Sequence, residues 1–304
     1  MKNVTLTTEP EKGYELIDSG EEEKLERYGA YVLARPDPQA LWPKQLPESE
    51  WKKADAWYER TGKEGKWHTR KDLPKEWRVS FGGLTFIVRP TSFKHVGLFP
   101  EQLPNWQWID STIRANGSTV SAPKVLNLFA YTGGATLAAA AAGAEVVHLD
   151  ASKTAVQWAK ENAAASGLSE KSIRFIVDDA LAFVKKELKR GSRYDGILLD
   201  PPAFGHGPKD ELWKIEEHLL PLLELCKELL SEHPLFFLVN GYASGYSPLA
   251  FAHNLASLTN RGGDIEYGEL TIQESAQCSV LSAQRDSQKE GRLLPAGIFA
   301  RWST

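Results

Sequence analysis

A glycine pair and a downstream carboxylate have the spacing of a nucleoside-binding site. Gly133 and Gly134 end the apolar run VLNLF, residues Val125–Phe129, and an alanine-rich stretch of high helix propensity follows them. Asp150 comes 17 residues after Gly133, where a second apolar run ends. In a strand–turn–helix–strand unit, a carboxylate at this position accepts hydrogen bonds from both ribose hydroxyls. We therefore expect an adenosine-containing cofactor at this turn.

The glycine spacing bears on which cofactor this is. NAD and S-adenosylmethionine (SAM) both place adenosine at such a turn, but SAM has no pyrophosphate, and the glycines depart from G-x-G-x-x-G. The pattern favours SAM, with a NAD-dependent oxidoreductase as the alternative. In VDDALAFV, Asp179 could accept a hydrogen bond from the adenine amine, and Ala180 offers a backbone N–H to the ring. Alternatively, Asp178 and Asp179 only cap a helix that begins at Ala180.

The run YDGILLDPPAF, residues 194–204, predicts a rigid turn with acceptor groups. Asp200 ends an apolar strand, and Pro201 and Pro202 lack N–H groups and have a fixed φ. In methyltransferases that act on planar nitrogen, such a turn holds the amine through its acceptors while an aromatic ring, here Phe204, stacks on the substrate. The alternative is a loop stop without chemistry. We expect Asp200, Pro201, Pro202 and Phe204 to form the catalytic group.

Apolar strands that alternate with amphipathic helices predict an α/β protein with a parallel sheet. Helices are expected to begin at Thr132, Ser152, Asp179 and Lys209. The last two strands, joined by a long polar loop, would complete a Rossmann-like, seven-stranded sheet. The predicted strands are Val125–Phe129, Glu145–Leu149, Ile173–Val177, Gly196–Leu199, Leu235–Val239, Asp264–Thr271 and Ala296–Trp302.

The residue composition and the pattern of predicted elements differ between the two parts of the chain. Residues 1–90 are predicted to be a small β-rich domain, with strands in Tyr28–Pro36 and a hairpin in Trp77–Pro90 that turns at Gly82-Gly83, and residues 91–304 to be the catalytic domain. Between Lys44 and Arg78, basic residues alternate with aromatic ones, a composition that suits phosphate contacts and base stacking. The alternative is a small core with solvated lysines. Residues 1–90 are thus a possible substrate-binding domain.

Bulk composition narrows the class of protein. The 304 residues, 42% hydrophobic and 25% charged with a net charge of -4, are typical of a globular protein. No apolar segment suits a signal peptide or a membrane span, and two cysteines are too few for a disulfide framework. We expect a cytoplasmic protein without a membrane partner and without a metal site. The oligomeric state is not predicted.

With LNLFAYTGGAT, Asp150, VDDAL and DPPAF in this order, the chain resembles class I SAM-dependent methyltransferases. More closely, it is similar to the bacterial 23S ribosomal RNA large-subunit methyltransferases that modify cytosine C5 or guanine N7, from about Phe93 to Trp302. The segment HVGLFPEQ, residues 95–102, resembles the one these enzymes place across the cofactor. The resemblance implies methyl-side positioning by Asp200 and Pro201. It also implies SAM binding by Gly97, Phe99, Gln102, Phe129, Ala130, Tyr131, Thr132, Gly133, Gly134, Asp150, Ala151, Asp179, Ala180 and Asp200.

The chain departs from this family at two places. Cytosine-C5 members carry a nucleophilic cysteine after the fifth strand, where this chain has VNGYASGYSP, residues 239–248. C5 methylation requires a thiolate that attacks C6. Cys226 lies in an apolar helix pattern and is interpreted as structural, whereas Cys278 lies in a polar loop near the end of the sheet. The N-terminal segment also lacks the pattern of the usual RNA-delivering domain.

The leading hypothesis is therefore direct attack on SAM by a base nitrogen of RNA, with ribosomal RNA as the expected partner. His206, Tyr242 and Tyr246 are candidate substrate-binding residues, although His206 is better explained as a flexible, glycine-flanked loop residue. Trp213 is interpreted as a helix-packing residue. The alternatives are a C5 enzyme with the displaced Cys278, a methyltransferase of a protein or small molecule, and a non-catalytic SAM-binding factor.

Overall fold

The chain folds into two compact units. The computed structural model describes residues 1–61, 64–70, 72–91, 94–116, 122–242, 245–275 and 291–304. Unit 1 comprises Met1–Leu6, Gln102–Leu270 and Gly297–Thr304, and unit 2 comprises Thr7–Glu101 and Thr271–Ala296. The predicted functional division at residues 90 and 91 stays a prediction, because compactness alone does not define what a domain does.

Unit 1 is built on a twisted sheet with the strand order β1-β16-β17-β15-β12-β9-β10-β11. The seven predicted strands all form, and the N-terminal strand β1 extends the sheet to eight. Strands β15, β12, β9, β10 and β11 are mutually parallel, and β17 is antiparallel to β15. The strands are β1 Lys2–Thr8, β9 Lys124–Leu128, β10 Glu145–Asp150, β11 Ile173–Val177, β12 Gly196–Leu199, β15 Phe236–Gly241, β16 Asp264–Gln273 and β17 Leu293–Ser303.

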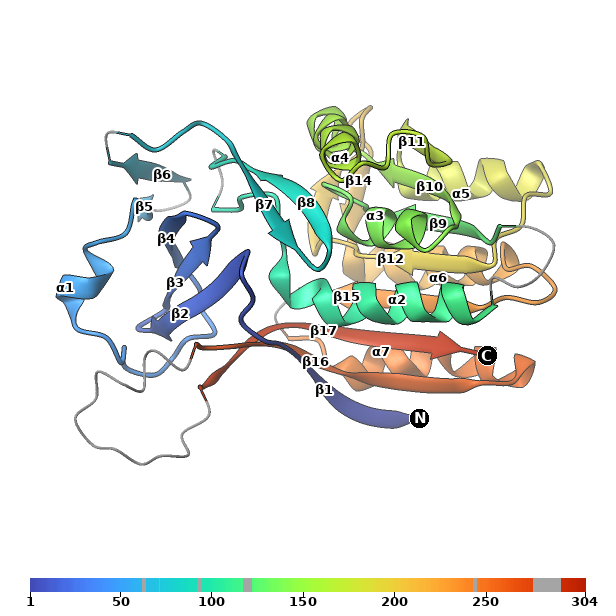
Figure 1. Ribbon diagram of the computed structural model, residues 1–304. Helices are drawn as coiled ribbons and strands as arrows, with labels where there is room; N and C mark the ends of the chain where they lie inside the picture. The colour runs from blue at the N-terminus through green and yellow to red at the C-terminus, as the bar shows by residue number, and fades with distance from the viewer. Residues whose placement is uncertain (62–63, 71, 92–93, 117–121, 243–244, 276–290) are drawn as a thin grey trace. The chain divides into compact units, whose positions relative to one another are not determined.

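Helices cover both faces of this sheet, which explains why its central strands are mostly apolar. Alternate residues of β12 face opposite ways: Ile197 and Leu199 belong to one buried cluster and Leu198 to the other. The first cluster includes residues of α5, α6 and α7, and the second residues of α2 and α3, which lie in front of the sheet in Figure 1. The helices are α2 Leu103–Asn116, α3 Gly134–Ala141, α4 Lys153–Ala165, α5 Ala180–Lys189, α6 Ile215–Glu228, α7 Pro248–Leu255 and the 3-10 helix η2 Ala256–Arg261.

Two predicted helix starts are confirmed and two are corrected. Ser152 and Asp179 are the N-caps of α4 and α5, where their side chains accept a backbone N–H. The helix expected at Thr132 begins at Gly134. The helix expected at Lys209 is wrong: this segment forms a hairpin of β13, Phe204–His206, and β14, Leu212–Lys214, and α6 begins only afterwards. Asp210, with a φ of 66°, cannot continue a right-handed helix.

Unit 2 is rich in strands, as predicted for this part of the chain. Its five-stranded sheet has the order β2-β3-β4-β5-β6, and β7 and β8 form the expected hairpin through Gly82 and Gly83. The predicted strand Tyr28–Pro36 is divided between β3 and β4 by a turn at Gly29, whose φ is 62°. The elements are β2 Tyr14–Gly20, β3 Glu23–Tyr28, β4 Tyr31–Pro36, α1 Glu48–Trp51, β5 Ala56–Thr61, β6 Glu64–Thr69, β7 Trp77–Phe81 and β8 Leu84–Val88. The 3-10 helix η1, Pro100–Gln102, ends on the first residue of the main segment of unit 1.

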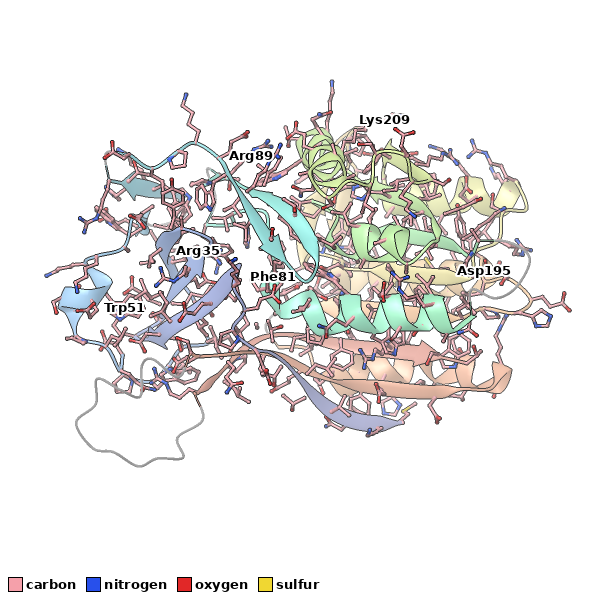
Figure 2. All side chains as sticks on the ribbon, in the orientation of Figure 1. Arg35, Trp51, Phe81, Arg89, Asp195 and Lys209 are labelled. Carbon is pink, nitrogen blue, oxygen red and sulfur yellow. The ribbon has the colours of Figure 1, made fainter. Side chains whose placement is uncertain are left out.

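The core of unit 2 contains a buried ion pair. Arg35, labelled in Figure 2, lies 2.6 Å from the Glu26 carboxylate, which also accepts the hydroxyl of Tyr14 at 2.7 Å. Burial alone would raise the pKa of the Glu26 carboxyl, but the charges of Arg35 and Lys24 hold it below its ordinary value. Because each charge is compensated by hydrogen bonds, removal of either partner would leave an expensive buried charge.

Within the described ranges, no helix is long and apolar enough to cross a membrane. The same part of the chain contains no group of three or more His, Cys, Asp or Glu side chains that could hold a metal ion.

Candidate active site

The predicted site residues of unit 1 gather where parallel strands end. The carboxyl ends of β9, β10, β11, β12 and β15 share one edge of the sheet, and each is followed by a segment that the sequence singles out. Asp195, labelled in Figure 2, marks the opposite edge, where its carboxylate accepts the N–H of Lys124 at 2.8 Å. Open α/β sheets bind their ligands at the carboxyl edge.

The loop after β9 has an unusual backbone. Phe129, Tyr131 and Gly133 have φ angles of 55°, 47° and 93°, so three alternate residues are left-handed although two of them carry aromatic side chains. A non-glycine residue in this region costs on the order of 1 kcal/mol, and such residues cluster at functional sites. The Phe129 ring packs on Trp213 with centroids 4.8 Å apart, and the Tyr131 ring lies 6.3 Å from that of Trp158. This packing offsets the strain and holds the loop in one conformation.

The two glycines are required by close contacts. A Cβ at Gly134 would lie 2.2 Å from Cζ2 of Trp106, and one at Gly133 would lie 3.2 Å from Cβ of Ala159. The N–H of Gly133 donates to the carbonyl of Ala130 at 2.9 Å, which tightens the turn. Gly134 therefore permits the close approach of α2 to α3, and Gly133 permits the left-handed turn.

Asp150 fastens this loop to the end of β10. Its two carboxylate oxygens accept the backbone N–H groups of Tyr131 and Ser152, each at 2.8 Å. Burial raises the pKa of Asp150, and the two N–H groups oppose that effect. Each oxygen keeps a second lone pair, so the predicted contact with the ribose is chemically compatible with these bonds.

A buried polar chain that the sequence did not reveal lies beneath the loop. The amide of Asn127 donates to Oγ1 of Thr136 at 2.9 Å, and the same oxygen lies 2.9 Å from Nδ1 of His148. Burial lowers the pKa of His148 to about 3 against the opposing effect of the Tyr131 backbone, so the imidazole is neutral. Thr136 accepts from Asn127, and its hydroxyl is placed to donate to Nδ1 of His148 in the tautomer that leaves this nitrogen unprotonated. These residues lie on β9, α3 and β10, and no sequence spacing connects them.

Asp179 has the helix-capping role that was considered as its alternative. Its Oδ1 accepts the N–H of Ala182 at 2.8 Å, and Asp178 forms an ion pair with Lys186 at 2.6 Å. Ala180 is buried at the first turn of α5. The contact of Asp179 with adenine stays a prediction, which its second carboxylate oxygen can serve.

The Asp200 turn is held from two sides. The backbone N–H of Asp200 lies 3.4 Å from the carbonyl of Leu128, and the N–H of Ile215 donates to the carbonyl of Ala203 at 3.0 Å. Oδ1 of Asp200 is shielded from solvent. Phe204 is 59% exposed, as expected of a ring that stacks on a bound substrate.

Trp213 connects this turn to the loop after β9. Its indole N–H donates to the carbonyl of Pro202 at 2.7 Å, and the same ring is the one that packs on Phe129. Trp213 lies in β14, directly opposite Gly205, and packs on a helix as interpreted, because its buried ring stacks on that of His218 in α6 with centroids 5.6 Å apart. One side chain therefore touches both segments expected to meet at the transferred methyl group.

Residues 58–231, more than half of the chain, match the model of a family described as S-adenosylmethionine-dependent methyltransferase. The chain belongs to this family. The predicted family and cofactor are thereby confirmed: this is a SAM-dependent methyltransferase. A crystal structure of a SAM-dependent methyltransferase from Agrobacterium tumefaciens is 40% identical with a TM-score of 0.89, covering 99% of this chain and 95% of that one.

Curated relatives are less completely matched. The ribosomal RNA large subunit methyltransferase K/L of Shewanella sp. (strain MR-4) is 34% identical over 152 residues, which is 49% of this chain. The ribosomal RNA large subunit methyltransferase K of Neisseria meningitidis serogroup B is 26% identical over 244 residues, or 74% of this chain. These matches span only 20% and 64% of the relatives' own lengths.

The residues around the loop of the methyltransferase fit SAM. Gly133 and Gly134 have no Cβ atoms, the Asp150 carboxylate has spare lone pairs, and residues 129–134 include no cationic side chain. These features suit an uncharged adenosine rather than a phosphate. The individual contacts of Phe129, Ala130, Thr132 and Ala151 with SAM stay predictions. So do those of Gly97 and Phe99, which belong to unit 2.

The predicted substrate residues are placed at different points of this edge. Nδ1 of His206 lies 2.8 Å from Asp210 across the β13–β14 hairpin, so His206 belongs to a strand and not to an irregular loop. Tyr242 follows β15, and its hydroxyl accepts the side-chain amide of Gln102 at 2.6 Å. Tyr246 packs near Phe251, and burial, together with the nearby Glu216, raises the pKa of its phenol.

The cysteines differ in what the structure says of them. Cys226 is buried in α6, and burial alone raises the pKa of its thiol far above the ordinary value, so it is structural, as interpreted from the sequence. Cys278 lies outside the described residues.

Proposed function

We propose that this methyltransferase methylates a nitrogen atom of an RNA base, most naturally in ribosomal RNA. The observation that carries the proposal is the Asp200 turn, which combines a carboxylate acceptor with the exposed ring of Phe204 at the carboxyl edge of the sheet. The names of the Shewanella and Neisseria relatives support ribosomal RNA as the substrate. A cytoplasmic location, where ribosomes are made, belongs to the same proposal.

The chain's own groups suffice for such a reaction. When bound, SAM supplies a methyl group that a nucleophile in line with the sulfonium, at about 3 Å, can take as the nitrogen–carbon bond forms and the carbon–sulfur bond breaks. Asp200 would accept a hydrogen bond from an exocyclic amine and orient its lone pair. A proton that the methylated amine sheds would pass to this carboxylate or to water. Phe204 would hold the base by stacking, a contribution of about 1–3 kcal/mol.

The buried thiol of Cys226 and the lack of a cysteine directly after β15 argue against methylation at carbon. A C5 reaction needs a thiolate beside the base, yet the segment after β15 contains none, and Cys226 is buried and protonated. Cys278 would have to serve if C5 were the target. Nitrogen attack needs neither cysteine.

The N-terminal domain of residues 1–90 is proposed to bind the RNA. Trp57 is 43% exposed on β5, and its ring stacks on His68 of β6 with an interplanar angle of 9°. Such a flat, exposed aromatic pair suits stacking with an unpaired base. The exposed lysines of the turn after α1, Lys52 and Lys53, would contact phosphates.

The test is transfer of labelled methyl from SAM to RNA from a strain that lacks this gene, with naked 23S RNA and ribosomal subunits as separate fractions, followed by nucleoside mass spectrometry. An N-methylated base is expected, and Asp200→Ala should abolish labelling while SAM still binds. Methylcytosine at C5 would contradict the proposal and implicate Cys278. SAM binding without labelling of any RNA fraction would reject the RNA substrate in favour of a protein or small molecule.

A further inference from the structure

A chain of buried side chains connects Gln102 to the end of β17. The Nη1 group of Arg301 donates to Oδ1 of Asn105 at 3.2 Å, and Nδ2 of Asn105 donates to Oδ1 of Asn240 at 3.0 Å and to Oε1 of Gln102 at 3.1 Å. Nε2 of Gln102 donates in turn to the hydroxyl oxygen of Tyr242 at 2.6 Å. Asn105 is fully buried, and Gln102, Asn240 and Arg301 are at least nine-tenths buried.

The chemistry of arginine sets the direction of this chain. A guanidinium can only donate, so the atom of Asn105 that faces Arg301 must be the carbonyl oxygen. The amide nitrogen of Asn105 therefore faces Gln102 and can meet only its carbonyl oxygen. The amide nitrogen of Gln102 then faces Tyr242, and the phenol oxygen must accept. Glu266 fixes the arginine itself through a 2.7 Å ion pair.

Tyr242 is thereby prepared as a hydrogen-bond donor. Because its oxygen accepts from Gln102, its hydroxyl hydrogen is turned away from Gln102. The ring is 40% exposed, and Gly297, where a Cβ would lie 3.2 Å from Cε1 of Tyr242, leaves room for it. The buried, hydrogen-bonded side chains from Arg301 to Gln102 thus determine that the exposed Tyr242 hydroxyl acts as a donor.

The strand order places Tyr242 relative to the other predicted site residues. Leu199 of β12 is the register partner of Val239 of β15, so Asp200 and Tyr242 both follow neighbouring parallel strands at the carboxyl edge. The SAM loop follows β9 on the other side of β12, and Asp150 ends β10 beyond it. The ribose would lie on the β10 side of the Asp200 turn, and the methyl acceptor on the β15 side.

We propose that Tyr242 donates a hydrogen bond to the methyl acceptor, at a carbonyl oxygen or an unprotonated ring nitrogen, and that Asn105 is the positioning residue that imposes this donor role. Asp200 and Tyr242 then recognise opposite groups, an N–H and an acceptor atom, on one edge of a planar ligand. That the ligand is an RNA base rests on the proposed function, whereas the polarity of the chain does not.

The polarity can be tested without a substrate. In Tyr242→Phe the amide of Gln102 loses its acceptor, so NMR should show faster hydrogen exchange and an altered shift for its side-chain N–H groups. Unchanged Gln102 amide signals would overturn the donor direction. The variant changes one hydroxyl on an exposed ring, so it should fold normally.

The role of Tyr242 in catalysis can be tested by reversing the direction of these hydrogen bonds. Asn105→Asp keeps the bond to Arg301 but replaces the amide donor with an acceptor, so the Gln102 amide should turn over and Tyr242 should donate to Gln102 instead of the ligand. The matched control is Asn116→Asp, the same change at the exposed end of the same helix. With labelled SAM and ribosomal RNA from a strain lacking the gene, kcat/KM for RNA should fall about tenfold in Asn105→Asp and in Tyr242→Phe.

The remaining outcomes also decide the matter. The Kd for SAM should stay within about twofold of wild type, and the double variant should be no worse than Tyr242→Phe, because both changes remove the same hydrogen bond. Weaker SAM binding in place of a lower kcat/KM would overturn the assignment to the acceptor, and additive losses would overturn the shared path. If wild-type protein labels no RNA, the proposed function fails, and the Gln102 amide signals still decide the donor direction.

Discussion

The contact between Trp213 and Pro202 predicts how catalysis depends on a residue outside the expected site. Trp213→Phe removes the indole N–H that donates to the Pro202 carbonyl at 2.7 Å but keeps an aromatic ring against Phe129. Loss of one hydrogen bond, with the carbonyl left poorly satisfied, should lower the free energy of unfolding by about 1–3 kcal/mol. Because the carbonyl belongs to the Asp200 turn, the acceptor groups should also lose their position, and a misplacement of about 1 Å can reduce a rate by about 100-fold.

The assay separates these two effects. Urea unfolding measures stability, titration measures SAM affinity, and single-turnover methyl transfer measures chemistry. We expect kcat to fall at least tenfold while the Kd for SAM changes less than about threefold. The matched control is Trp302→Phe, which removes an equally buried indole N–H from the carbonyl of Gly262 at 2.9 Å, on a strand of the same unit. Equal losses of kcat in the two variants at equal losses of stability would refute the positioning argument.

Three further changes test separate parts of the molecule. Gly134→Ala should weaken SAM binding and lower the free energy of unfolding by about 1–3 kcal/mol, because its Cβ would meet Trp106 at 2.2 Å; titration and urea unfolding check this. In Glu26→Gln the free energy of unfolding should depend less on pH in the acid range. The lowered pKa of Glu26 adds stability to wild type above the unfolded-state pKa of about 4.3, and wild type loses this stability as the pH falls through the folded-state pKa. Reversing the charges of Lys52 and Lys53 to Glu should weaken RNA retention in filter binding at low salt and leave SAM affinity unchanged; unchanged retention would remove this face from the RNA site.

Structural features that depend on residues close together in the sequence can be predicted from it, whereas features that depend on residues far apart cannot. The strands of unit 1 and the N-caps at Ser152 and Asp179 follow from apolar runs and from single capping residues. The prediction of a helix from Lys209 fails at the β13–β14 hairpin because Asp210 is left-handed, which its side chain alone does not indicate. The chain from Arg301 to Tyr242 joins residues about 200 positions apart, and only the folded sheet brings them together.

The same distinction applies to where the predicted site residues lie in the fold. Asp150, Asp200 and Tyr242 all follow the strands expected of them, because the position of a strand's end is written in a short apolar run. The side-chain partners are different: Gln102 was expected at the cofactor, yet its amide is engaged by Tyr242 and Asn105. Partnerships of this kind depend on which helix packs beside which strand, and neither is encoded locally.

The left-handed aromatic residues of the loop after β9 have a thermodynamic consequence. Since Phe129 and Tyr131 are fixed by Trp213 and Trp158 within the protein itself, the loop gives up its conformational entropy during folding. Little ordering would then remain for the moment of ligand association, and the observed affinity would reflect contacts rather than rearrangement. Calorimetry should accordingly find a heat-capacity change that matches the apolar area of the ligand alone, and association should proceed in a single kinetic phase.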